Sequence, residues 1–230
     1  CNLHPVVKEE YKEPCSRLYV KDKKTLLFEV TYYKKRINFE VFHVLTDGTG
    51  ATEFLKELVS NYLYLAHQKE GLEPVSMLPE DMTVQDQESD SFLKYYSKDQ
   101  KRPKEKKTRA FQIRRKKKDG NHLHVHESVV SVKEVLKRSR ELGVSMTVFL
   151  TAVFLKAIHE EMSKMQEKKP IVLMVPVNLR KFFPSTSMLN FFNWIEPGYD
   201  FSKQDRNFEA VLGYTKEFFK EQLTKEKMSA

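Results

Sequence analysis

The chain has 230 residues, of which 40% are hydrophobic and 12% aromatic, enough for one large domain or two small ones. No run reaches the roughly 18 apolar residues that a membrane span needs, and no secretory signal pattern is present. The two cysteines, Cys1 and Cys15, make no disulfide framework. We therefore expect a cytoplasmic protein without a membrane partner.

The positive charge belongs to one segment. Residues 98–118 hold twelve Lys or Arg against Asp99 and Glu105, a net +10, so the total of +8 leaves −2 for the rest of the chain. A protein that binds nucleic acid over a broad surface would spread its basic residues more widely. We expect a solvated loop and no nucleic-acid partner; single-stranded nucleic acid and the phosphates of coenzyme A are the alternative ligands.

The first elements in chain order are two strands and a helix. Residues 26–33 are rich in β-formers, and residues 36–42 alternate apolar with polar and run into His43. Apolar residues at helical spacing then predict a helix from Ala51 to Ala66, with Thr49 as its N-cap.

Residues 70–108 lack periodicity and predict a long, mobile, charged connection. The later expected elements are strands at 111–113, 123–130, 171–175 and 189–195, and helices capped by Ser131, capped by Ser145 and starting near Asp205. The second of these helices is apolar on most sides, so we expect it to be deeply buried. The run 171–175 is typical of a central strand covered on both faces. This mixture of strands and long helices predicts an α/β layered fold.

The six residues His43-Val44-Leu45-Thr46-Asp47-Gly48 stand where the second strand ends. An imidazole titrates near neutral pH and suits general-base chemistry. Asp47 is placed to hold the turn by pairing with a cation, and Gly48 leaves room for a ligand or adopts a backbone angle that other residues resist. The alternative interpretation is purely structural: a strand end, an aspartate at a helix entry and a turn glycine.

This segment resembles the His-x-x-x-Asp-Gly motif of the superfamily of chloramphenicol acetyltransferases, plant acyltransferases, alcohol acetyltransferases and peptide-synthetase condensation domains. Val175-Pro176-Val177-Asn178-Leu179-Arg180 resembles the family's strand ending in Pro-Val-x-x-Arg, and Asn190-Phe191-Phe192-Asn193 resembles a later Phe-x-Asn motif. The chain is most similar to bacterial proteins described as alcohol acetyltransferase-like, over roughly residues 12–215.

The resemblance implies a CoA-dependent acyltransferase in which His43 removes the acceptor's proton as the acceptor attacks a thioester, without an acyl-enzyme. Asp47 and Arg180 inherit a structural ion pair, and Asn193 an expected contact with the substrate or intermediate. Many members have two consecutive histidines, whereas this chain has Phe42 first, which we expect in the core. The co-substrate would be acyl-CoA or a phosphopantetheine thioester, with a small alcohol or amine as acceptor and no bound cofactor or metal.

Two other functions stay open. One is condensation-type amide or ester formation on carrier-bound thioesters, and the other is a non-catalytic scaffold. His122, His124 and His126 share one face of an expected strand, where a solvated face is favoured over a metal site. His67 and His159 lie on expected helices, where we expect surface or packing roles.

The position of the motif suggests the two-lobed form of a chloramphenicol acetyltransferase-like sandwich. We expect residues 1–128 to be part of an N-terminal lobe, with the charged connection at about 70–108, and residues 129–230 to start a C-terminal lobe. On this interpretation the chain is a fragment, and exposed apolar walls would favour self-association.

Overall fold

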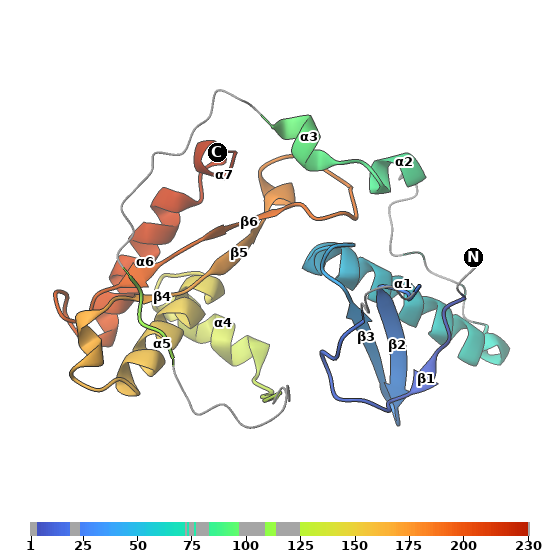
Figure 1. Cartoon of the computed structure of the whole chain (residues 1–230), viewed down its shortest axis with the longest axis horizontal. Coiled ribbons are helices and arrows are strands. Elements are labelled where there is room, and N and C mark those ends of the chain that lie inside the picture. Colours follow the sequence, from blue (N-terminus) through green and yellow to red (C-terminus); the bar gives the residue numbers. More distant parts are fainter. Residues whose placement is uncertain are drawn as a thin grey trace. The chain divides into compact units, whose positions relative to one another are not determined.

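The computed structural model describes residues 4–18, 24–71, 73, 76, 83–96, 109–113 and 125–229. The chain divides into two compact units, each built from separate stretches of sequence (Figure 1). Unit 1 comprises Cys1–Tyr95, Lys118–Val125 and Phe183–Phe192, and unit 2 comprises Tyr96–Lys117, His126–Phe182 and Asn193–Ala230. The segment Phe183–Phe192 therefore returns to the part of the chain that contains the His-x-x-x-Asp-Gly motif. The lobe boundary expected near residue 128 stays a prediction.

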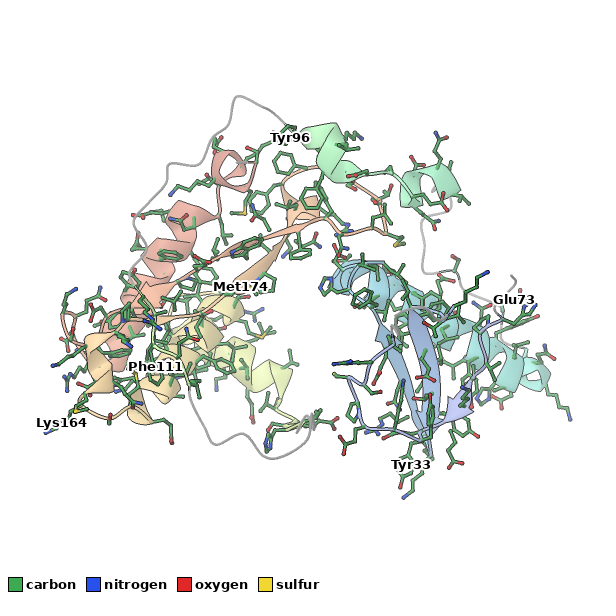
Figure 2. The ribbon with its side chains drawn as sticks, viewed as in Figure 1. Tyr33, Glu73, Tyr96, Phe111, Lys164 and Met174 are labelled. Carbon is green, nitrogen blue, oxygen red and sulfur yellow. The ribbon has the colours of Figure 1, made fainter. Side chains whose placement is uncertain are left out.

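A three-stranded sheet in the order β1-β2-β3 forms one layer of unit 1. Its strands are β1 (Lys8–Glu9), β2 (Phe28–Tyr33) and β3 (Arg36–Val41). β1 runs parallel to β2, and β2 pairs antiparallel with β3 from Phe28 opposite Val41 to Tyr33 opposite Arg36. Tyr33 lies at the hairpin end of this sheet in Figure 2. The two strands expected before the motif are therefore confirmed.

Helix α1 (Gly48–Ala66) packs on this sheet through aromatic contacts (Figure 1). The ring of Phe54 lies 4.6 Å from that of Phe39 and 5.9 Å from that of Phe28, centroid to centroid. The helix begins earlier than expected, because its N-cap is Asp47 and not Thr49. Asp and Thr are both good N-caps, and the sequence alone does not show which of them keeps an extended backbone.

Short elements complete unit 1. They are η1 (Gln68–Glu70), α2 (Val84–Gln87) and α3 (Ser91–Tyr95), the last two within the expected charged connection. The ring of Phe92 lies 5.3 Å from that of Phe191, and the ring of Tyr95 lies 5.2 Å from that of Phe183. These contacts fix part of the connection to the returning segment. Most of the remaining connection, including much of the lysine-rich segment, falls outside the described residues.

Unit 2 combines helices with two small sheets. Its elements are α4 (Val132–Glu141), α5 (Met146–Glu160), η2 (Gln166–Lys168), β4 (Ile171–Val172), β5 (Val175–Asn178), η3 (Leu179–Lys181), β6 (Phe192–Ile195, whose first residue belongs to unit 1), β7 (Gly198–Tyr199), α6 (Phe208–Gln222) and α7 (Lys225–Met228). The caps expected at Ser131 and Ser145 are confirmed, since each hydroxyl accepts from a backbone N–H three residues on. Gly143 follows α4 in the left-handed conformation, with φ +65°.

Three expectations for unit 2 are wrong. The run 171–175 is not one central strand: β4 pairs with β7, β5 pairs with β6, and Met174 between them is 70% exposed (Figure 2). Phe111 donates its N–H to the carbonyl of Pro170, but residues 111–113 form no strand. Residues 125–130 form none either, and the rest of that expected strand falls outside the described residues.

Helix α5 is buried along one side only, and it contacts α4, α6 and β4. Ala152 and Leu155 are fully buried, as is Val211 on α6. Phe154 is 60% exposed, and Leu150 and Val153 are also exposed, so the expectation of a deeply buried helix is wrong. No single helix among the described residues has the length and apolarity to span a membrane; α4 and α5 meet that test only as a pair bent by 88°.

Leu155→Ala should destabilise unit 2 by about 2–5 kcal/mol, because it leaves a cavity at a fully buried position. The matched control is Phe154→Ala on the same helix, which removes more atoms from an exposed position and should cost about 1 kcal/mol or less. Urea unfolding followed by circular dichroism measures both. A larger loss for Phe154→Ala would contradict this packing of α5.

Candidate active site

His43 lies in a turn directly after β3. Phe42 extends the pairing by donating its N–H to the carbonyl of Leu27 at 2.8 Å, and the N–H of Leu45 closes the turn onto the carbonyl of Phe42 at 3.0 Å. His43 is exposed, which a base that meets a substrate requires. Phe42 is 45% exposed, so the expectation that it belongs to the core is wrong.

Asn190, from the returning segment of unit 1, contacts both the ring and the backbone of the turn. Its Oδ1 lies 3.2 Å from Nδ1 of His43, and its Nδ2 donates to the carbonyl of His43 at 2.8 Å and to that of Val44 at 3.3 Å. The ring of Phe192 lies 5.4 Å from the His43 ring, tilted by 51°. The imidazole is thus held by an amide and an aromatic ring that follow it by almost 150 residues.

The carboxylate of Asp47 joins the turn, the start of α1 and the returning segment. Asp47 is only 5% exposed. Its Oδ1 accepts from the N–H groups of Thr49 and Gly50 at 3.0 and 3.1 Å, capping α1, and its Oδ2 accepts from the N–H of Phe191 at 2.9 Å. A buried carboxylate is stable when its oxygens receive donors in this way. Asp47 therefore holds the turn through backbone N–H donors, whereas its expected pairing with a cation stays a prediction.

Gly50 is the glycine that packing requires. A Cβ placed there would lie 2.2 Å from Oγ1 of Thr46 and 2.4 Å from the carbonyl oxygen of Met188. Those two atoms are themselves hydrogen-bonded at 2.6 Å. Gly48 differs: a Cβ there meets nothing within 4 Å, and its φ is not positive. An unusual backbone angle therefore does not explain Gly48, and open space beside it is compatible with room for a ligand.

The other site residues expected from sequence lie in unit 2. Arg180 is in η3, and its N–H and Nη1 both donate to Oδ1 of Asn178, at 3.0 and 3.3 Å. Asn193 is in β6, donates its Nδ2 to the carbonyl of Met228 at 3.3 Å and accepts from the N–H of Trp194. Because Asp47 belongs to unit 1, its pairing with Arg180 stays a prediction, as does the contact of Asn193 with an intermediate.

Surface or packing roles are also predicted for His159 and His67. His159 is buried and stacks on Phe201 at 3.9 Å, and its Nε2 lies 3.3 Å from Oε1 of Glu167. Burial lowers the pKa of His159 below its ordinary value, and the Glu167 charge opposes this shift. His67 is exposed at the end of α1, so the surface and packing roles expected for these two are confirmed. His122 and His124 fall outside the described residues, among which no metal-binding group occurs.

Sequence reasoning did not assign functional roles to Thr46, Gly50 or Asn190. A signal existed for Gly50, because the motif continues as Asp47-Gly48-Thr49-Gly50 and a second small residue so close to the first suggests a close approach. Asn190 lies in the string that resembles a family motif, but the resemblance points to Asn193. Only the fold brings Asn190 to His43.

Gly50→Ala should destabilise unit 1 by about 1–3 kcal/mol, since the added methyl group forces apart a hydrogen-bonded pair. Gly48→Ala is the matched control two residues earlier. It should be neutral or stabilising by up to about 1 kcal/mol, because alanine favours the helix and meets no atom. Thermal or urea unfolding measures both. Equal effects would contradict the close approach of Gly50 to Met188.

Asp47→Ala should cost about 2–4 kcal/mol, because it removes the N-cap of α1 and leaves the buried N–H of Phe191 without its acceptor. Asn207→Ala removes the cap of α6 alone and should cost about 1 kcal/mol. The loss of stability for Asp47→Asn should lie between these two values, since the amide keeps one acceptor oxygen. Urea unfolding gives the loss of stability of each variant. Equal losses for Asp47→Ala and Asn207→Ala would show that the bond from Phe191 contributes nothing.

Comparison with known proteins gives one family. The family model described as alcohol acetyltransferase matches residues 6–191, a range that holds the His43 turn and its partners Asn190 and Phe191. No curated protein sequence matches the chain significantly. A match over most of the chain shows the family. The described mixture of helices and small sheets is consistent with the expected α/β fold. The chain belongs to the alcohol acetyltransferase family.

Proposed function

We propose that this chain transfers an acyl group, in the simplest case acetyl, from coenzyme A to the hydroxyl group of an alcohol, with His43 as general base. The proposal rests on one observation: an exposed imidazole stands on a turn that is hydrogen-bonded before it, from Phe42 to Leu27, and after it, through the side chains of Thr46 and Asp47. The family supports acyl transfer with an alcohol as acceptor. A rigid turn supports the chemistry because catalysis depends on holding the base at the reacting proton.

The proposed reaction is one displacement. His43 takes the proton from the acceptor hydroxyl while the oxygen attacks the thioester carbonyl. The C–O bond forms, the tetrahedral intermediate collapses, and the C–S bond breaks. The thiolate of coenzyme A then receives the proton held on His43. An ester and a free thiol leave, and the histidine returns to its starting state without a covalent acyl-enzyme.

Asp47 and Arg180 complete the proposal as an architectural pair. A carboxylate can accept about four hydrogen bonds, so a guanidinium is compatible with the three backbone donors that Asp47 already receives. Such a pair would tie η3 to the motif turn in the two-lobed, chloramphenicol acetyltransferase-like arrangement. A pair-specific loss in a double-mutant cycle of Asp47 and Arg180 would support it.

His43→Ala should lower turnover by about 10²–10⁴-fold, the usual contribution of a general base, while leaving the unfolding midpoint within experimental error. His67→Ala, at an exposed histidine beyond α1, should keep full activity. Release of free thiol from acetyl-CoA is measured with a panel of alcohols, and ester formation is followed separately by chromatography. The second readout is needed because Cys15 is exposed and reacts with thiol reagents. Normal ester formation by His43→Ala would refute the assignment.

A further inference from the structure

We propose that Asn190 is a positioning residue that holds His43 in the tautomer with its proton on Nδ1 and so makes Nε2 the basic nitrogen. The structural part of this inference stands on the contacts of the amide. Its catalytic consequence rests on the proposed function of His43.

The orientation of the Asn190 amide follows from its partners. One end of the amide faces the carbonyl oxygens of His43 and Val44, at 2.8 and 3.3 Å. A carbonyl oxygen only accepts, so the group that faces both must be the NH₂, which has two hydrogens to donate. The reverse orientation would set three oxygens against one another. The amide oxygen is therefore the atom that lies 3.2 Å from Nδ1 of His43.

The tautomer of His43 follows from that orientation. An amide oxygen carries no hydrogen, so a hydrogen bond at this distance requires Nδ1 of His43 to donate. A neutral imidazole has one N–H, and its other nitrogen then carries the lone pair. Nε2 is left to accept the proton of a substrate. An isolated histidine side chain favours the opposite tautomer, so this contact changes the ground state of the residue.

Asn190 is itself held on both sides. Two residues earlier, the carbonyl of Met188 accepts from the hydroxyl of Thr46 at 2.6 Å. One residue later, the N–H of Phe191 donates to Asp47 at 2.9 Å. The backbone on each side of Asn190 is therefore bonded to the turn that carries His43, and this holds the amide beside the imidazole. Thr46 and Asp47 act on His43 through this segment.

The tautomer is measured directly by ¹⁵N NMR of the full chain labelled at histidine, at a pH where the rings are neutral. The His43 signals are those that disappear in His43→Ala. In the native chain Nδ1 should carry the proton. In Asn190→Ala the population should move toward the Nε2–H form. Asn61→Ala, which removes an amide bonded to the carbonyl of Glu57 on α1, should leave the signals unchanged.

Asn190→Asp separates the positioning role from a purely structural one. The carboxylate still accepts from Nδ1 of His43 but donates to neither carbonyl, and its second oxygen faces both carbonyl oxygens, so it braces the turn no better than Asn190→Ala. Positioning predicts that the Asp variant, assayed at a pH high enough to keep its ring neutral, keeps the Nδ1–H tautomer and more turnover than the Ala variant. A role confined to bracing the turn predicts equal losses. For Asn190→Ala we expect kcat to fall about 10–100-fold, less than removal of the base itself, with KM for acetyl-CoA changed less than about threefold.

The outcomes distinguish this inference from the proposed function. An Nε2–H tautomer in the native chain, or no change of tautomer in Asn190→Ala, would overturn the role of Asn190 even if His43→Ala abolishes ester formation. The expected tautomers together with an unaffected His43→Ala enzyme would overturn the function and leave the structural inference standing. Equal kcat losses in the Ala and Asp variants would overturn the positioning role and leave Asn190 with a structural role only.

Discussion

The carboxylate of Asp47 is the contact on which the rest of the site depends. It is buried, and it accepts from backbone N–H groups of two segments that lie far apart in the sequence: the first turn of α1 and Phe191. Because the donors are backbone groups, the carboxylate fixes the path of the chain and not only a side chain. Asp47 lies only four positions after His43, so any movement of this anchor moves the imidazole.

Sequence reasoning worked where the signal was local. Richness in β-formers predicted the first strand before His43 and alternation predicted the second. Apolar spacing predicted α1, and hydroxyl residues before apolar runs predicted the caps at Ser131 and Ser145. The predicted position of His43, just after the end of a strand, is also correct. Asn190 could not be found this way, because its contact with His43 depends on the return of a distant segment and leaves no trace in spacing.

The errors share one physical cause. An apolar run reports that a segment is able to be buried, but not which neighbours cover it. The apolar run 171–175 predicts one covered strand. In the structure its first two residues, β4, pair with β7, whereas its last residue begins β5, which pairs with β6, and Met174 between them is exposed. Helix α5 is apolar nearly all round, yet only its Ala152 and Leu155 side is packed. The tertiary partners decide both cases.

Two different side chains hold the backbone of the turn and the imidazole ring. The charged group, Asp47, is directed at backbone donors and sets the architecture. A neutral amide, Asn190, faces the imidazole. A carboxylate beside the ring would favour the charged imidazolium before any substrate is bound, whereas an amide can fix the tautomer with less of that bias. A base must be neutral when it meets the acceptor hydroxyl. Placing the amide at the ring and the carboxylate at the backbone satisfies both requirements within one short turn.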